Sequence, residues 1–169
     1  QTIIYEKDGL PFPPQNKYYS IFEYSFVFSK GKPVSVNLIE EKNKWAGSKS
    51  KPTYRQVDGP QNGGTKKIIN ETRPKTNIWR YKVGHSKTTL DKYAFVHPAM
   101  YPEALARDHI LSWSNPGDLV LDPFMGSGTT AKMAMQNGRD FLGFDISPEY
   151  VELAKKRVVW ANPPLLVIG

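Results

Sequence analysis

The chain has 169 residues, of which 39% are hydrophobic and 12% aromatic, so it can form an ordinary globular domain and is not a disordered polypeptide. It contains no cysteine, which excludes a disulfide scaffold and a Cys-ligated zinc site, and no metal site is expected. Residues 1–90 carry 16 Lys and Arg against 7 Asp and Glu, whereas residues 91–169 carry 7 against 9, so the net charge of +7 is uneven and suggests a polyanionic partner.

The N-terminal part predicts strands and turns. Residues 10–14 contain three prolines and predict a loop. Residues 19–29 alternate and predict a strand with its aromatic side chains on one face. Gly31-Lys32-Pro33 ends that strand, and Val34 to Ile39 can return as another one.

The next region is basic and poor in aliphatic residues. Residues 42–87 hold twelve Lys and Arg against Asp58 and Glu71. Gln61-Asn62-Gly63-Gly64 predicts a loop tip within it. A polyanion-binding surface and a merely solvated lysine-rich surface remain alternatives for this region.

From Tyr93 onward the pattern is typical of alternating strands and helices. The expected elements are a helix from Pro102 to about Trp113, a turn at 115–118, a strand at Leu119–Leu121, a helix from the Gly126–Thr130 turn through Met135 that stops at Asn137-Gly138, a strand at Phe141–Phe144 ending at Asp145, and a helix capped by Ser147 with Pro148 first, running to about Val159. This order predicts an α/β fold with a parallel, doubly wound sheet.

The strongest functional signal is the turn that follows residues 119–121. Its glycines allow a tight turn and a close ligand, and Asp145, 23 residues after Asp122, can accept hydrogen bonds from ribose hydroxyls. An acidic residue at the strand tip would repel a pyrophosphate, and it suits a cofactor with a cationic amino-acid end such as S-adenosylmethionine. The formal match of Gly126-x-Gly128-x-x-Ala131 to a dinucleotide fingerprint leaves an NAD-binding domain as a weaker alternative, and a turn used only for packing is another.

Four segments carry a resemblance to a known family. Asp122-Pro123-Phe124-Met125-Gly126-Ser127-Gly128-Thr129-Thr130 resembles the cofactor motif of the S-adenosylmethionine-dependent DNA amino-methyltransferases, which methylate the exocyclic nitrogen of adenine or cytosine. The segments His97–Glu103 and Phe144–Tyr150 resemble the flanking motifs of the family's beta arrangement, and Phe22–Lys30 resembles the strand before its target-recognition region. The resemblance covers nearly the whole chain and corresponds to the C-terminal portion of such an enzyme.

The resemblance implies a Rossmann-like methyltransferase sheet, incomplete here, with an inserted basic DNA-recognition region. The implied ranges are 1–40 for strands of the catalytic half, 41–92 for target recognition and 93–169 for the cofactor-binding half. The residues implied to bind S-adenosylmethionine are Asp122, Pro123, Phe124, Gly126, Ser127, Gly128, Thr129, Asp145, His97, Pro98 and Tyr101. For His97 a purely structural role beside Pro98 is an equal alternative.

The implied partner is double-stranded DNA, whose target base must flip out of the helix to be reached. The candidate DNA-binding residues are Lys44, Lys49, Arg55, Lys66, Lys67, Arg73, Asn77 and Arg80. For any one of them a phosphate contact or a solvated charge is the more ordinary interpretation than base recognition. Trp45 and Trp79 can equally anchor a small core.

The family's catalytic motif, Asp, Asn or Ser followed by Pro-Pro and an aromatic residue, is not found. Phe12-Pro13-Pro14-Gln15 lacks both the polar first residue and the aromatic, and Asn162-Pro163-Pro164-Leu165 has Leu in place of the aromatic and is interpreted as a tail. We therefore expect a DNA methyltransferase, adenine favoured over cytosine, whose present chain is inactive alone; a catalytically dead cofactor- and DNA-binding remnant is the alternative.

Further expectations concern the surroundings of the protein. No apolar run is long enough to span a bilayer, and a cytoplasmic, DNA-associated protein encoded by a bacterium, archaeon or phage is expected. A homodimer and a restriction endonuclease partner are also considered.

Overall fold

The computed structural model describes residues 1–9, 16–51, 53–56, 59–63 and 66–161. It divides the chain into two compact units, a larger one formed by Gln1–Asn37 with Asn77–Gly169 and a smaller one formed by Leu38–Thr76. Residues 77–92 therefore belong to the larger unit, although the sequence grouped them with the basic region. No helix among the described residues is long and apolar enough to cross a membrane.

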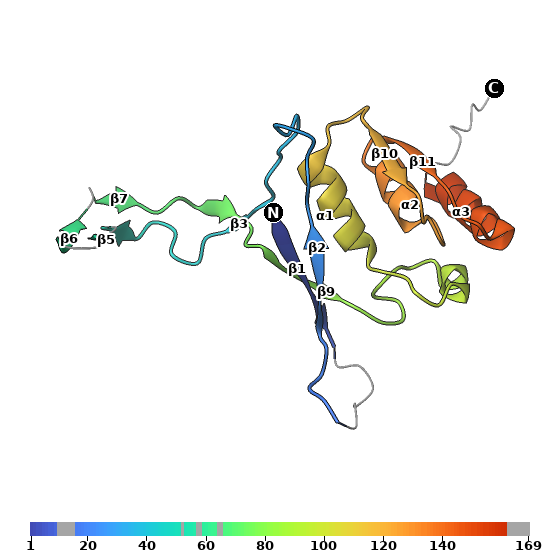
Figure 1. Cartoon of the computed structure of the whole chain (residues 1–169), viewed down its shortest axis with the longest axis horizontal. Helices are drawn as coiled ribbons and strands as arrows, with labels where there is room; N and C mark the ends of the chain where they lie inside the picture. The colour runs from blue at the N-terminus through green and yellow to red at the C-terminus, as the bar shows by residue number, and fades with distance from the viewer. Residues whose placement is uncertain (10–15, 52, 57–58, 64–65, 162–169) are drawn as a thin grey trace. The chain divides into compact units, whose positions relative to one another are not determined.

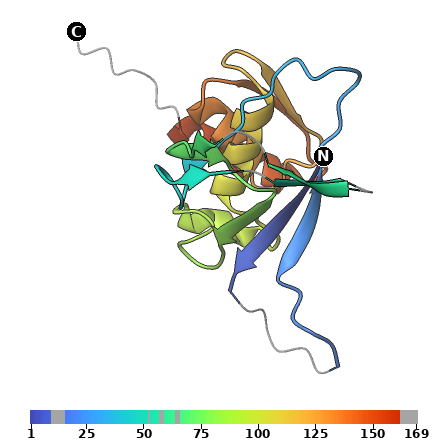
Figure 2. The same cartoon turned by 90° about the vertical axis from the view of Figure 1, so that its left-hand side faces the viewer.

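A three-stranded sheet in the larger unit has the order β2-β1-β9 (Figures 1 and 2). Its strands are β1 (Thr2–Asp8), β2 (Phe22–Phe26) and β9 (Ile78–Lys82). β1 pairs antiparallel with β2 and parallel with β9. Alternation puts Ile3 and Tyr5 of β1, with Trp79 and Tyr81 of β9, into one buried cluster. Trp79 therefore anchors a core.

The helix α1 (Glu103–Trp113) packs against the β2-β1-β9 sheet and also against the elements that follow it in the chain. Leu105 joins the cluster of the β2-β1-β9 sheet, while Ala106 and Ile110 join a second cluster with Met133 and Ala134. Figure 1 shows α1 between that sheet and the elements that follow it in the chain. The predicted helix from Pro102 to Trp113 is confirmed, with Pro102 as its N-cap.

The C-terminal elements confirm the predicted order of strands and helices. They are the 3-10 helix η1 (Lys92–Val96), β10 (Leu119–Asp122), α2 (Thr129–Gln136), β11 (Asp140–Gly143) and α3 (Pro148–Ala161). β10 and β11 pair in parallel, with Leu119 opposite Asp140 and Asp122 opposite Gly143. The expected stop of α2 is also present, because Gly138 has a φ of +72°.

Helices cover one face of the β10–β11 pair. Phe141 packs against the clusters of both α2 and α3. On the other face, Leu119, Leu121, Leu142 and Phe144 remain exposed. Among the described residues, helices cover one face of this strand pair and apolar side chains are exposed on the other, as in part of a larger α/β sheet.

Two local predictions are wrong. Val34 to Ile39 forms no strand, because the N–H of Asn37 donates to the carbonyl of Ser112 (2.8 Å) and its side-chain amide donates to those of Leu111 (3.2 Å) and Ser114 (3.0 Å). These carbonyls at the end of α1 have no donor within the helix. Asn37 supplies donors to them, and residues 34–39 therefore pack on the helix end and do not pair as a strand. Gln61 to Gly63 lies in a strand and is not a loop tip.

The described residues of the smaller unit form three antiparallel strand pairs, in which the first strand pairs with the last, the second with the fifth and the third with the fourth. Its strands are β3 (Glu40–Lys42), β4 (Lys49–Ser50), β5 (Thr53–Gln56), β6 (Gly59–Gly63), β7 (Lys67–Ile68) and β8 (Thr72–Pro74). β3 pairs with β8, β4 with β7 and β5 with β6. We call this unit, residues 38–76, the ribbon. It carries nine Lys and Arg against four Asp and Glu.

Candidate ligand site at the ends of strands β10 and β11

Two carboxylates lie at one edge of the β10–β11 pair. Asp122 is the last residue of β10, and Asp145 follows the last residue of β11, Gly143, by two positions. Because the strands are parallel, both carboxyl ends reach the same edge. In open α/β sheets, ligands bind in the crevice at this edge.

The main chain between these carboxylates is held by a series of hydrogen bonds. The N–H of Met125 donates to the carbonyl of Phe144 (2.8 Å), and the N–H of Gly128 donates to the carbonyl of Met125 (2.9 Å). The N–H of Gly126 donates to Oδ2 of Asp145 at 2.9 Å. The turn is thus tied to the strand end that carries the second carboxylate.

The conformation of the turn favours glycine at position 126. Its φ is +52°, and an added Cβ atom would lie 2.8 Å from Nε2 of His97. The ring of His97 also packs on Tyr150, with 4.5 Å between ring centroids, and its Nδ1 accepts the N–H of Ala99 at 3.2 Å. His97 therefore covers the turn and orders the segment after it, while Pro98 is exposed.

The carboxylate of Asp122 is oriented by its own turn and by the first residues of α2. Its Oδ1 accepts the N–H of Phe124 (3.0 Å), and its Oδ2 accepts the hydroxyl of Thr130 (2.5 Å). The hydroxyl of Tyr101 shares a hydrogen bond with that of Thr130. Burial raises the pKa of Tyr101, and the nearby charge of Asp122 raises it further. Sequence reasoning did not single out Thr130 as the residue that links these two.

Asp145 accepts main-chain hydrogen bonds with both oxygens. Oδ1 accepts the N–H of Ser147 and Oδ2 that of Gly126, each at 2.9 Å. The Ser147 N–H is the main reason that the pKa of Asp145 lies below its usual value, with further lowering by Gly126 and by His97. An ionised carboxylate has about four acceptor positions, so each oxygen can still accept a ligand hydroxyl.

Apolar side chains flank the two carboxylates. Phe124 is 87% exposed and Ile146 is fully exposed, although both side chains are large and apolar. Carboxylates that are followed closely in the sequence by such side chains can hold the hydroxyls of a nucleoside whose flat base packs on the apolar atoms. The same carboxylates disfavour a pyrophosphate and attract a cationic amino group. Ile146 was not among the expected site residues. Its position directly after Asp145 is the feature of the sequence that could have indicated it.

The other expected cofactor residues lie on the same turn. Pro123 follows Asp122 and is exposed, while Ser127 and Thr129 are buried and Thr129 begins α2. The structure thus brings all eleven expected residues into one connected region of the larger unit.

The expected DNA-binding residues are divided between the two units. Lys44, Lys49, Lys66 and Lys67 are exposed on the ribbon, and Arg73 there binds the carboxylate of Glu41 at 2.8 Å. Asn77 and Arg80 belong to the larger unit, where Asn77 donates to the carbonyl of Thr2 (3.2 Å) and Arg80 binds Glu6 (2.8 Å). The side chain of Arg55 lies outside the described residues.

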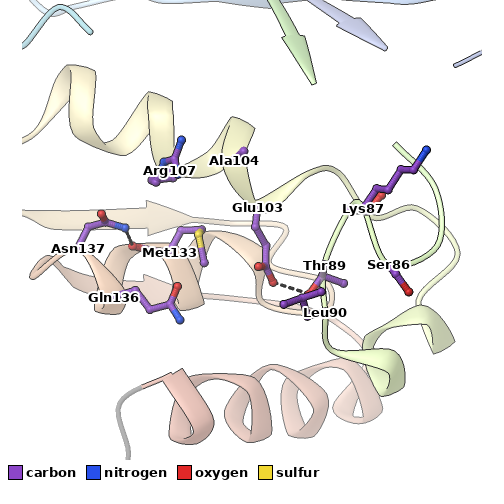
Figure 3. Close-up of a pocket in the computed structure, with 11 residues that line it drawn as sticks. Ser86, Lys87, Thr89, Leu90, Glu103, Ala104, Arg107, Met133, Gln136 and Asn137 are labelled. Atoms are coloured by element: carbon purple, nitrogen blue, oxygen red, sulfur yellow. Dashed lines mark hydrogen bonds between the residues drawn. The ribbon is translucent and has the colours of Figure 1, made fainter. Parts of the chain in front are cut away.

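A separate hollow of about 600 Å³ lies between α1, α2 and residues 86–90. Figure 3 shows Glu103 pointing toward Thr89 there, with a hydrogen bond of 2.6 Å between them. None of the expected cofactor residues lines this hollow. It is therefore distinct from the edge that carries Asp122 and Asp145.

Known proteins are similar to this chain along nearly all of its length. A family model described as DNA methylase matches residues 1–156. The orphan methyltransferase M.BamHII of Bacillus amyloliquefaciens is 55% identical over 161 residues, which cover 93% of this chain and 61% of that protein. The DNA adenine methyltransferase YhdJ of Escherichia coli (strain K12) is 43% identical over 82 residues, covering 48% of this chain and 27% of that protein.

A solved structure agrees with these sequence relatives. The crystal structure of an M1.HpyAVI–SAM complex is 27% identical, with a TM-score of 0.57, and the match covers 94% of this chain and 61% of that one. The chain thus spans about three fifths of the length of M.BamHII and of M1.HpyAVI.

Proposed function

The chain belongs to the DNA methylase family, and from this premise we propose that its turn of residues 122–130 binds S-adenosylmethionine for methyl transfer to DNA. The observation that carries the proposal is the pair of carboxylates, Asp122 and Asp145, on either side of a glycine turn at one edge of parallel strands. The similarity to M1.HpyAVI, whose crystal structure is a complex with SAM, supports S-adenosylmethionine as the cofactor.

Each part of the site has a role in this proposal. Asp145 accepts the ribose hydroxyls, and Asp122 with the turn receives the cationic methionine end. Phe124 and Ile146, both strongly exposed, pack on the two faces of the adenine. His97, Pro98 and Tyr101 close the methionine side. The cofactor supplies an activated methyl group on its sulfonium sulfur.

The ribbon is proposed to contact double-stranded DNA. Its exposed lysines, among them Lys44, Lys49, Lys66 and Lys67, can neutralise phosphates of any sequence. A two-stranded ribbon is also narrow enough to enter a DNA groove. In this proposal, the candidates for reading base edges are Arg55 and Arg73 of the ribbon and Asn77 and Arg80 of the larger unit.

The acceptor is proposed to be the exocyclic amino nitrogen of a flipped base, with adenine favoured over cytosine. The naming of the relative YhdJ as an adenine methyltransferase supports this preference.

Activity of this chain by itself is not part of the proposal. The sequence has no Asp-, Asn- or Ser-Pro-Pro-aromatic segment, and Asn162-Pro163-Pro164-Leu165 lies outside the described residues. An inactive remnant that binds cofactor and DNA is therefore the second candidate. Methyl transfer after a segment with the Pro-Pro-aromatic motif is supplied to the chain separates the two, because neither candidate predicts transfer by the chain alone.

Isothermal titration calorimetry of the chain with S-adenosylmethionine, and with NAD as the competing cofactor, tests the central proposal. Saturable binding of S-adenosylmethionine without binding of NAD is expected. The reverse preference would overturn the proposal in favour of a dinucleotide site.

Self-association is proposed from the exposed apolar face of β10 and β11. Sedimentation velocity over a range of protein concentrations tests it, and a single monomeric species throughout would contradict a homodimer. A restriction endonuclease partner and a cytoplasmic location remain predictions.

A further inference from the structure

Arg157, on α3, is fully buried, although it carries a charge. Burying a guanidinium is costly unless it is paired and hydrogen-bonded. Here Nε donates to Oδ2 of Asp91 (2.9 Å) and Nη2 donates to Oε1 of Glu103 (2.6 Å). Lys132 of α2 binds the same two carboxylates, at 2.9 Å each, so two cations share two anions.

The third nitrogen of the Arg157 guanidinium, Nη1, is directed at the glycine turn. Nη1 lies 3.0 Å from the carbonyl oxygen of Ser127, and also 3.0 Å from the hydroxyl oxygens of Ser127 and Thr129. The guanidinium thus joins the buried ion cluster to the segment that the two carboxylates of the site enclose.

This contact fixes the orientation of one peptide plane in the turn. The carbonyl of Ser127 and the N–H of Gly128 belong to the same planar peptide group. Arg157 holds the carbonyl, and the carbonyl of Met125 accepts the N–H at 2.9 Å. With Gly126 held by Asp145, the main chain of the turn is fixed at several points before any ligand arrives.

We propose that Arg157 is a positioning residue, which holds residues 126–129 in the conformation that receives the cofactor. A glycine-containing turn has many accessible conformations, and ordering it only on binding would weaken affinity. Because Arg157 is fully buried, it acts through the turn and not by contact with a ligand. This inference rests on the proposed binding of S-adenosylmethionine by the same turn.

Arginine is needed at this position because of its shape. A guanidinium presents donors in a rigid fork, so it can bind Asp91, Glu103 and Ser127 at the same time. A lysine ammonium keeps the positive charge but is a compact group that cannot bind both sides of the cluster. Arg157→Lys therefore separates charge compensation from positioning of the turn.

The experiment compares the full chain with Arg157→Lys, Arg157→Met and a control, Arg139→Met. Arg139 is also buried, but its guanidinium holds the carbonyls of Ser114 (2.7 Å) and Asn137 (2.6 Å), which are not part of the turn. Hydrogen exchange of the amides of Gly126 and Gly128 is measured by NMR without added cofactor. Affinity for S-adenosylmethionine is measured by calorimetry, under conditions in which urea unfolding shows that wild type and variants are equally folded.

In both Arg157 variants the two amides should exchange about tenfold faster or more, and affinity should fall about tenfold or more, the scale of removing one charged hydrogen bond. Arg139→Met should leave both quantities near the wild-type values. If Arg157→Met does not fold, Arg157→Lys decides the question, because it keeps the charge that the cluster requires.

Wild-type exchange and affinity in Arg157→Lys would overturn the inference, as would equal effects in Arg139→Met. If the wild-type chain does not bind S-adenosylmethionine, the proposed function fails. The amide exchange then still decides whether Arg157 fixes the turn.

Discussion

A Cβ atom on Gly128 would lie 2.7 Å from the Cβ atom of Ala154, so the turn and α3 approach at a distance that only glycine permits. Gly128 also has a φ of +80°, in the left-handed region. Close packing and backbone conformation thus require glycine at this position independently.

Gly128→Ala should lower the free energy of unfolding by about 2–5 kcal/mol, because it adds both backbone strain and a clash. Gly117→Ala is the matched control, since Gly117 has a similar φ of +85° but open space around its Cβ position. Its cost should be only about 1–2 kcal/mol. Urea unfolding measures both variants. Equal costs would mean that α3 moves away from the turn freely.

Asp145→Ala should weaken binding of S-adenosylmethionine by roughly ten- to a hundredfold, the scale of a hydrogen bond to a charged group. It also removes the acceptor for the N–H groups of Gly126 and Ser147, so Asp145→Asn, which keeps one oxygen, should be milder. Asp140→Asn, at the opposite end of β11, is the control. Calorimetry that gives the same affinity for Asp145→Ala and wild type would remove Asp145 from the site.

Charge reversal of Lys66 and Lys67 to Glu should weaken binding to all DNA duplexes about equally. The slope of log K against log salt concentration should become shallower by about 0.9 for each phosphate that the variant no longer neutralises. Fluorescence anisotropy over a salt series measures both effects, and Lys30 and Lys32, exposed residues outside the ribbon, provide a control pair of the same charge. Weakened binding to one sequence alone would show that Lys66 and Lys67 read bases.

Stability at acid pH should depend on Asp91. Burial favours its neutral form, but hydrogen bonds and charges from Lys132 and Arg157 outweigh burial and lower its pKa. A lowered pKa in the folded state stabilises the protein above the unfolded pKa of about 3.9, and this stabilisation is lost as pH falls through the folded value. Wild type should therefore exceed Asp91→Asn in unfolding free energy at neutral pH, by a margin that shrinks below about pH 4. A margin independent of pH would contradict the ion pairing.

The chain alone should not transfer methyl groups to DNA. Cofactor binding positions the methyl group, but no Pro-Pro-aromatic segment among residues 1–161 orients the target nitrogen, and orientation supplies much of the rate. Transfer of labelled methyl from S-adenosylmethionine to mixed-sequence DNA tests this, with M.BamHII as the positive comparison. Robust transfer would identify Asn162-Pro163-Pro164-Leu165 as a catalytic candidate.

The region around the glycine turn was predictable because its signals are local. A short strand, a glycine turn and a second strand ending in an acidic residue place Asp122 and Asp145 at one edge once the strands are parallel. Glycine after Asn137 likewise predicts the end of α2 from the sequence alone.

Features that depend on distant partners were not predictable. Val34 to Ile39 has a strand-like composition, but Asn37 bonds instead to the end of α1, more than 70 residues away. Arg157 binds Asp91, 66 residues before it, and Glu103, 54 residues before it. In the sequence, Arg157 follows Lys155 and Lys156 and resembles an ordinary exposed cation. Its burial depends on the tertiary fold.

The ribbon begins and ends at one place. The N–H of Lys75 donates to the carbonyl of Ile39 at 2.7 Å, next to the paired first and last strands of the ribbon, β3 and β8. The residues on either side, Asn37 and Asn77, are each fastened within the larger unit, to Ser112 and to Thr2. A segment with adjacent, separately anchored ends can be replaced by another of different length without displacing either anchor. On the proposed DNA contact of the ribbon, exchange of residues 38–76 as a unit would change the recognised sequence while the turn of residues 122–130 keeps its geometry.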